Sequence, residues 1–227
     1  MKTIAERLKS VQMTVEQSAL DAHRPLNAVQ LLAVSKTKPV SDIVQAYAAG
    51  QRLFGENYVQ EGVEKIQMLR SHDNIEWHFI GPLQSNKTRL VAENFDWVQA
   101  VDRLKIAQRL NDQVPLKKIL NVCIQVNIDD DENKAGISVS ELDDFAKAIA
   151  ELPNLRLRGL MTVPRANQSQ AQQITSFTQM AILFEELKKH HLSVDTLSMG
   201  MSGDMQNAIN NGSTMVRVGT AIFGSRT

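Results

Sequence analysis

A lysine at the end of an apolar run is the first residue in this sequence that could do chemistry. Lys36 directly follows residues 31–35, four apolar residues and a serine, and Pro39 breaks the segment three positions later. A lysine partly removed from water has a lowered pKa, so more of it is the free amine that attacks an aldehyde to form a Schiff base. A strand-end lysine in a salt bridge or in solvent is the alternative, which Lys36 alone does not exclude.

Two segments near the C-terminus have the composition of a phosphate site. Residues 198–205 lead into a predicted helix, and residues 216–220 include the last apolar run. Backbone N–H groups, hydroxyls and helix N-termini bind phosphate, and glycines let the backbone approach it closely. Ordinary turns use the same residue types, which is the alternative. The candidate residues are Ser198, Gly200, Met201, Ser202, Gly203, Gly219 and Thr220.

Arg217 is predicted to point toward the same ligand, because strand alternation relates it to Thr220 three residues later. Its guanidinium could neutralise a phosphate, or it could face the pyridine nitrogen of pyridoxal 5′-phosphate (PLP). An arginine in the second position keeps that nitrogen unprotonated and weakens the ring as an electron sink. The flanking Val216 and Val218 disfavour the alternative, a surface arginine.

The elements that must position these residues alternate along the chain. The strand-like runs are residues 30–34, 52–54, 76–80, 97–101, 119–126, 155–163, 196–199 and 215–218. The helix-like stretches are residues 4–22, 41–49, 58–69, 85–92, 103–113, 140–151, 170–190 and 205–210. Ser140 is predicted to begin its helix, with Asp143 completing a capping-box-like start.

This alternation predicts a parallel sheet, since each parallel neighbour needs a crossover connection. Eight repeats favour a closed (β/α)₈ TIM barrel over residues 1–227 as one domain, with the helix 4–22 as an extra N-terminal element. A doubly wound open sheet is the alternative, although it usually has a glycine-rich turn after the first strand.

A barrel of this kind has its site at the C-terminal ends of the strands, which we call the mouth. The residues predicted to meet there are Lys36, Glu56, Asn57, His78, Asn127, Lys134, Met161, Ser198, Gly200, Ser202, Arg217, Gly219 and Thr220.

Composition disfavours several other classes of protein. Lys plus Arg and Asp plus Glu each number 25, and no basic stripe indicates a nucleic-acid partner. The N-terminus carries Lys2, Glu6 and Arg7, so it lacks the apolar core of a signal peptide, and no uncharged run is long enough to span a bilayer. The sequence therefore predicts a cytoplasmic protein without membrane association.

The sequence also predicts no metal site. The acidic run 129–133 lacks the glycine and the final glutamate of an EF-hand, since Lys134 and Ser140 stand at those positions. His78 has no second ligand at a suitable spacing. The single Cys123 lies in an apolar run, where a small buried hydrophobe is the better interpretation than a nucleophile.

Six segments resemble a known family, the pyridoxal phosphate homeostasis proteins, also called the YggS or PROSC family. They occur in the family's order over nearly the whole chain, and the stretch 77–87 is the most diagnostic. The segments are residues 33–39, 54–61, 77–87, 159–161, 197–202 and 216–224.

The resemblance implies a barrel like the N-terminal domain of bacterial alanine racemase, with PLP held as an internal aldimine on Lys36. It also implies phosphate contacts from Ser202, Gly219 and Thr220, and Arg217 near the pyridine nitrogen. The other residues expected at or near the cofactor are Asn57, Ser198, Gly200, Met201, His78, Met161, Lys38 and Lys134, of which Lys134 matches a loop lysine linked to PLP handling.

The same resemblance favours a carrier over a catalyst. Alanine racemases use a second base, a tyrosine from a separate domain of the partner subunit. This chain ends at Thr227 and contains only Tyr47 and Tyr58. We therefore expect a monomer that buffers PLP and delivers it to apo forms of PLP-dependent enzymes, without robust catalysis of its own. An amino-acid racemase and a barrel for another phosphorylated ligand are the alternatives.

Overall fold

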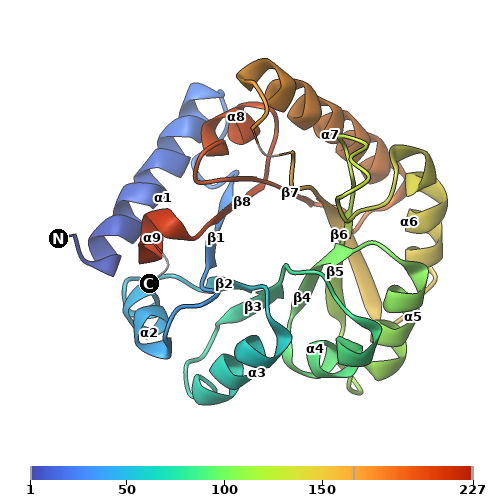
Figure 1. Cartoon of the computed structure of the whole chain (residues 1–227), viewed down its shortest axis with the longest axis horizontal. Helices are drawn as coiled ribbons and strands as arrows, with labels where there is room; N and C mark the ends of the chain where they lie inside the picture. The colour runs from blue at the N-terminus through green and yellow to red at the C-terminus, as the bar shows by residue number, and fades with distance from the viewer. Residues whose placement is uncertain (1, 166, 226–227) are drawn as a thin grey trace.

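Eight parallel strands close into a barrel in the computed structural model, which describes residues 2–165 and 167–225 (Figure 1). Each strand pairs with its neighbours in the sequence, and β8 pairs with β1 to complete the ring. The strands are β1 (Gln30–Val34), β2 (Leu53–Glu56), β3 (Glu76–Phe79), β4 (Trp97–Val101), β5 (Leu120–Gln125), β6 (Leu155–Met161), β7 (Thr196–Met201) and β8 (Met215–Val218).

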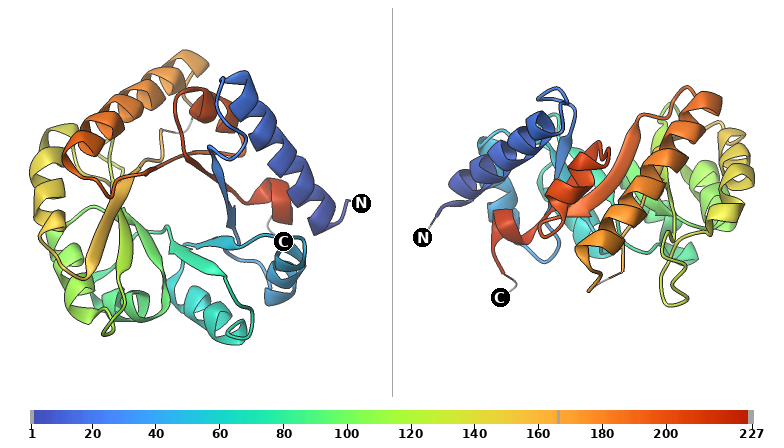
Figure 2. Two further views of the ribbon diagram at one scale, coloured as in Figure 1. Left: turned by 180° about the vertical axis from the view of Figure 1, so that it is seen from behind. Right: turned by 90° about the horizontal axis from the view of Figure 1, so that it is seen from above.

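Helices surround the barrel and connect one strand to the next (Figures 1 and 2). They are α1 (Ile4–Asp21), α2 (Val40–Ala48), α3 (Val59–Met68), α4 (Thr88–Asn94), α5 (Leu104–Gln113), α6 (Leu142–Ala150), α7 (Gln170–His190), α8 (Met205–Asn210) and α9 (Thr220–Phe223). The predicted (β/α)₈ barrel with an additional N-terminal helix is confirmed.

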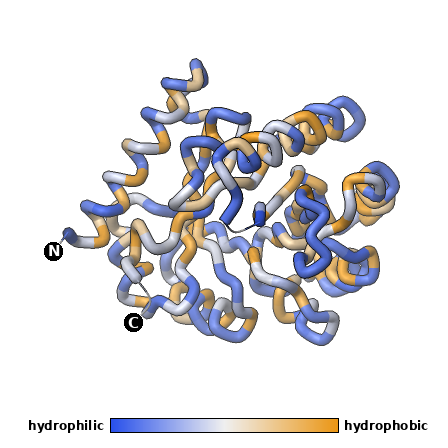
Figure 3. The backbone as a smooth tube through the Cα atoms, turned by 45° about the horizontal axis from the view of Figure 1, so that its top comes forward, coloured by the Kyte–Doolittle hydropathy of each residue, from blue (hydrophilic) through white to orange (hydrophobic). Residues whose placement is uncertain are grey.

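Apolar burial on both sides of the strands explains this architecture. Strand residues such as Phe54, Val98 and Leu197 are fully buried, and the helices turn apolar faces toward them. Hydrophobic residues therefore concentrate in the strands and on the inner helix faces, whereas many loops at the barrel ends are hydrophilic (Figure 3). The loops are left accessible for function.

The N-terminal helix α1 covers the outside of the barrel where β8 meets β1. Its start is fixed by a capping box between Thr3 and Glu6, and its buried face includes Leu8, Val11 and Val15. It packs against α8 and α9 (Figures 1 and 2). No helix within the described part of the chain is long and apolar enough to cross a membrane.

Two local predictions are wrong. The capping box before α6 joins Ser138 and Glu141 rather than Ser140 and Asp143, because a short 3₁₀ turn at Val139–Glu141 precedes the helix. The four-residue helix α9 was not predicted, since it is too short to give a hydrophobic period.

Candidate functional site

Lys36 lies in the turn between β1 and α2, at the mouth of the barrel. The buried Ser35 donates its N–H to the Gly55 carbonyl at 3.0 Å and so continues the pairing of β1 with β2. The Lys38 N–H then donates back to the Ser35 carbonyl at 3.0 Å, which closes the turn around the half-buried Lys36. The apolar strand thus delivers the lysine to the mouth, as predicted.

The segment after β8 lies directly beside this turn. Ala33 and Val218 are paired across β1 and β8. A Cβ atom built on Gly219 would lie 3.1 Å from the Val34 carbonyl oxygen, so glycine permits a close approach of the two backbones. The structure therefore brings Gly219 and the first residue of α9, Thr220, next to the segment that carries Lys36.

The segment after β7 contains one glycine that the fold requires and one that it does not. Gly200 has φ of +95°, and a Cβ atom there would lie 2.5 Å from the Ala208 Cβ. Gly203 has no atom within 4 Å of the corresponding position among the described residues. The Met201 N–H donates to the Asp204 carboxylate at 2.6 Å, which fixes the turn into α8. Packing against α8 therefore requires a glycine at position 200, whereas position 203 is open.

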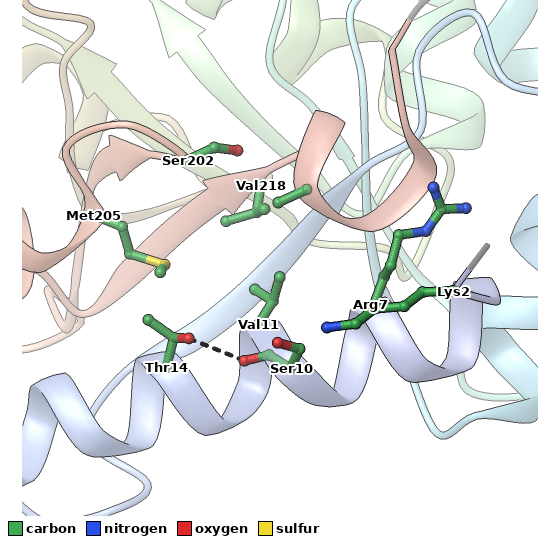
Figure 4. Close-up of a pocket in the computed structure, with 9 residues that line it drawn as sticks. Lys2, Arg7, Ser10, Val11, Thr14, Ser202, Met205 and Val218 are labelled. Carbon is green, nitrogen blue, oxygen red and sulfur yellow. Dashed lines mark hydrogen bonds between the residues drawn. The ribbon is translucent and has the colours of Figure 1, made fainter.

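Ser202 lines a cavity of about 410 Å³ between this turn and α1 (Figure 4). Lys2 and Arg7 also line it, on the side away from Ser202 (Figure 4). The Arg7 Nε is buried without a hydrogen-bond partner among the residues that the structure describes. Neither cation could be assigned to this cavity from sequence, because only packing of α1 against the end of the chain brings them there.

Arg217 lies inside the barrel with 5% of its surface exposed, so the surface alternative is wrong. One guanidinium nitrogen donates to the Ser198 carbonyl and hydroxyl oxygens, each at 2.8 Å, and the other donates to the Thr162 carbonyl at 2.8 Å. Burial lowers the pKa of Arg217 to about 10. The arginine is thus rigidly oriented between β6, β7 and β8.

A chain of hydrogen bonds continues from Ser198 through the barrel interior. The Ser198 hydroxyl donates to the Gln99 Oε1 at 2.6 Å, and the Gln99 Nε2 lies 2.9 Å from the His78 Nδ1. The His78 Nε2 lies 2.9 Å from the Glu76 carboxylate at the start of β3. The chain therefore connects the Arg217 side of the barrel with its opposite end, and the sequence analysis did not anticipate Gln99 in it.

His78 is neutral in this arrangement. The Gln99 amide donates to Nδ1, so the ring proton lies on Nε2 and is donated to Glu76. Burial is the main cause that lowers the pKa of His78, and a second ring proton would face the Gln99 N–H group. The ring stacks on Trp97 with centroids 4.9 Å apart. His78 is thus fully buried inside the barrel, one residue before the end of β3.

Asn57 directly follows β2, and Met161 is the last residue of β6, so both lie at the mouth. The Asn57 Oδ1 is buried and has no hydrogen-bond partner within the described part of the chain, so it can accept a bond from a ligand. A Cβ atom on Gly81 would lie 2.2 Å from the Asn57 carbonyl oxygen, which explains one glycine of the diagnostic stretch 77–87. Met161 is buried against Trp97 and Cys123.

The remaining candidate lysines contact other loops. Lys38 Nζ donates to the Ser225 carbonyl at 2.7 Å, and Lys134 Nζ donates to the Val163 carbonyl at 2.9 Å. Partial burial is the main cause that lowers the pKa of Lys134. Both side chains therefore donate hydrogen bonds to backbone carbonyl oxygens near the mouth.

The acidic run and the cysteine have structural surroundings. Asp129 accepts a hydrogen bond from the Ser176 hydroxyl of α7 at 2.6 Å, and Asp131 accepts one from Arg165 at 3.1 Å, so the run is bonded to α7 and to the loop before it. Within residues 2–165 and 167–225, no three His, Cys, Asp or Glu side chains gather as a metal site. Burial raises the pKa of the Cys123 thiol to about 12, which leaves it unreactive.

A buried group of charges lies beneath Lys36, and of its members only Glu56 was among the residues expected at the mouth. Glu56 is fully buried, and Lys65, on α3, has 5% of its surface exposed. Lys65 Nζ contacts Glu56 at 2.8 Å and Glu61 at 2.6 Å. Burial is the main cause that raises the pKa of Glu56. The only signal in the sequence is the four-residue spacing of Glu61 and Lys65, which is common on solvated helices.

Comparisons with known proteins agree with this geometry. The model of the alanine racemase N-terminal domain matches residues 16–227. A pyridoxal phosphate homeostasis protein of Pasteurella multocida is 59% identical and covers 99% of this chain and 98% of its own length. The protein of the same name from Escherichia coli K12 is 55% identical, covering 100% of this chain and 98% of its own.

Solved structures give the same result. PipY of Synechococcus elongatus with PLP bound has a TM-score of 0.86 and 37% identity, covering 98% of this chain and 100% of its own. Alanine racemase of Corynebacterium glutamicum has a TM-score of 0.70 and 19% identity; the match spans 98% of this chain and 60% of the racemase, and it shows the fold alone. This chain belongs to the alanine racemase N-terminal domain family and, within it, to the pyridoxal phosphate homeostasis proteins.

Proposed function

We propose that this protein binds PLP through a Schiff base on Lys36 and serves to buffer and deliver the cofactor. The observation that carries the proposal is the meeting of β1 and β8 at the mouth, where the Lys36 turn lies beside Gly219 and the start of α9. The PLP-bound PipY structure supports it, because that relative has the same fold over nearly its whole length.

The residues at the mouth fit the chemistry of PLP. Ser202, Gly219 and Thr220 offer hydroxyl and backbone donors to the phosphate, with Lys2 and Arg7 adding positive charge nearby. Asn57 has an unsatisfied buried acceptor for a polar group of the ring. We assign Gly200 and Met201 to the phosphate turn, Met161 to the apolar wall, and Lys38 and Lys134 to the rim.

Arg217 and Ser198 favour retention of PLP over catalysis with it. Bound PLP supplies an aldehyde for the lysine and a ring that withdraws electrons most strongly when its nitrogen is protonated. With its guanidinium fixed by Ser198 and Thr162, Arg217 would present a cation to that nitrogen and disfavour its protonation. Such a site would keep the ring a weak electron sink.

The tyrosines also support a carrier. The Tyr47 hydroxyl donates to the Asp73 carbonyl at 3.0 Å, in the loop that leads into β3, away from the mouth. Tyr58 is 53% exposed and lines a pocket together with Asn57 and Pro82. We propose that neither tyrosine serves as the second base of a racemase. We propose accordingly a monomeric cytoplasmic protein whose recipients are apo forms of PLP-dependent enzymes.

An absorbance spectrum of the purified protein tests PLP binding. The wild type is expected to show the visible band of a protonated Schiff base, and borohydride should attach the pyridoxyl group to Lys36. Lys36→Ala should lose the band, while Lys38→Ala should keep it. A colourless wild-type protein that still takes up no PLP on incubation, with no label on Lys36, would overturn the proposal.

Transfer and turnover assays separate the carrier from the racemase. The PLP-loaded protein should activate an apo-enzyme that depends on PLP, in proportion to the cofactor lost from Lys36. Robust racemisation of an amino acid that disappears in Lys36→Ala would instead establish a catalyst.

A further inference from the structure

Three charged side chains form a closed group beneath the Lys36 turn. Lys65 Nζ donates to Glu56 at 2.8 Å, to Glu61 at 2.6 Å and to the Ser35 carbonyl at 2.7 Å. An ammonium group has three protons, so these bonds use all of them. Lys65 is therefore committed to this group and does not compete with Lys36 for an aldehyde.

The group holds the backbone on both sides of Lys36. On the N-terminal side, Lys65 binds the Ser35 carbonyl and Glu56 accepts the Ser35 hydroxyl at 2.6 Å. On the C-terminal side, the Glu61 carboxylate accepts the Thr37 N–H at 2.6 Å. The same Glu61 oxygen binds Lys65, so the two sides of the turn are connected through one cation.

Thr37 shows why the turn needs to be held. Its φ is +62°, in the left-handed region that a β-branched residue rarely adopts. A strained conformation persists only where the surrounding structure fixes it, and such residues cluster at ligand sites. The bond from Thr37 to Glu61 is charge-assisted, which makes it stronger than a bond to a neutral acceptor.

We infer that Glu61 and Lys65 are positioning residues, which hold the Ser35–Thr37 turn so that Lys36 retains PLP. Glu56 neutralises Lys65 in the buried interior, where an unpaired cation would be unstable. The inference deepens the proposed function and rests on it for the identity of the ligand. The positioning itself is a property of the protein without cofactor.

Glu61→Ala tests the inference through release of PLP. We expect PLP to dissociate about tenfold faster, which is the effect of losing one charge-assisted hydrogen bond that holds the site. Glu61→Gln keeps an oxygen for the Thr37 N–H and should recover part of the loss. The matched control is Glu64→Ala, which removes an exposed carboxylate from the same helix and should release PLP at the wild-type rate.

The strain at Thr37 provides a second, independent readout. Thr37→Gly adopts a positive φ without strain. Glu61→Ala should therefore speed PLP release much less in the Thr37→Gly background than in the wild type. If Glu61 only stabilised the fold in general, Glu61→Ala would speed PLP release by the same factor in both backgrounds. Melting temperatures of the wild type, Glu61→Ala, Thr37→Gly and the double variant, all without cofactor, identify any protein that fails to fold.

Hydrogen exchange of the Thr37 amide tests the positioning without PLP. In the cofactor-free protein, Glu61→Ala should speed this exchange about tenfold or more, and Glu64→Ala should leave it unchanged. Unchanged exchange together with unchanged PLP release in Glu61→Ala would overturn the inference. Failure of the wild type to bind PLP would overturn the proposed function instead, and the exchange experiment would still decide the role of Glu61.

Discussion

Arg217 depends on a polar chain that runs through a largely apolar barrel. Each member donates to the next, from the guanidinium to Ser198, Gln99, His78 and finally Glu76. Buried polar groups are costly when unsatisfied, and this chain satisfies its internal members in a single direction. The orientation of the arginine thus depends on residues that do not lie at the mouth.

Gln99→Leu is predicted to destabilise the protein by about 1–3 kcal/mol, because it leaves the buried Ser198 O–H without an acceptor and the His78 Nδ1 without a donor. Urea unfolding measures this loss. Gln45→Leu, on an exposed position of α2, is the control and should change stability by less than about 0.5 kcal/mol. Equal effects of the two substitutions would contradict the importance of the chain.

His78 is predicted to make stability depend on pH. Its pKa is lowered in the folded protein by burial, so below the ordinary value of 6.5 the unfolded chain binds a proton that the folded protein does not. The stabilising contribution is complete above pH 6.5 and is lost as the pH falls from there toward the folded pKa.

Urea unfolding of the wild type and His78→Gln between pH 5 and pH 8 measures this contribution. The wild type should lose stability more steeply on acidification, by at most about 1.4 kcal/mol per pH unit for one proton. Parallel curves for the two proteins would show that His78 does not titrate on unfolding.

In the turn between β7 and α8, the local backbone and packing decide whether a glycine is required. Gly200→Ala is predicted to cost about 1–3 kcal/mol, since its φ of +95° is unfavourable for alanine and the new Cβ would meet the Ala208 Cβ at 2.5 Å. Gly203→Ala, three residues later in open space, should change stability by less than about 0.5 kcal/mol. Thermal unfolding compares them, and similar losses would contradict this account of the turn.

At the scale of the whole molecule, closure of the barrel couples ligand binding to global stability. β1 and β8 are the first and last strands, and their pairing places Gly219 beside Val34, two residues before Lys36. A ligand that binds both ends of the sheet therefore binds only the closed barrel.

PLP at one hundred times its dissociation constant should accordingly stabilise the wild type by about 2.7 kcal/mol. The melting temperature should rise with PLP concentration, and the rise should be largely lost in Lys36→Ala. An equal rise in both proteins would show that the stabilising PLP binds elsewhere.

Several features could be predicted from the sequence because they depend on local pattern. The apolar runs of β1, β4 and β8 were located at their observed bounds, since strands buried over most of their length are recognisable by composition. Eight alternations with helices then leave a closed barrel as the simplest solution. Lys36 was found in the same way, because its position follows from the end of one strand.

Only the tertiary structure decided which distant residues meet. Gln99 and His78 lie on the neighbouring strands β4 and β3, and the bond of Gln99 to Ser198 on β7 depends on barrel closure and register, which residue types do not encode locally. Lys65 resembled an ordinary surface lysine until packing of α3 buried it under the Lys36 turn. Sequence periodicity fixes which face of an element is apolar, whereas the pairing of polar groups inside the barrel depends on how all the elements pack together.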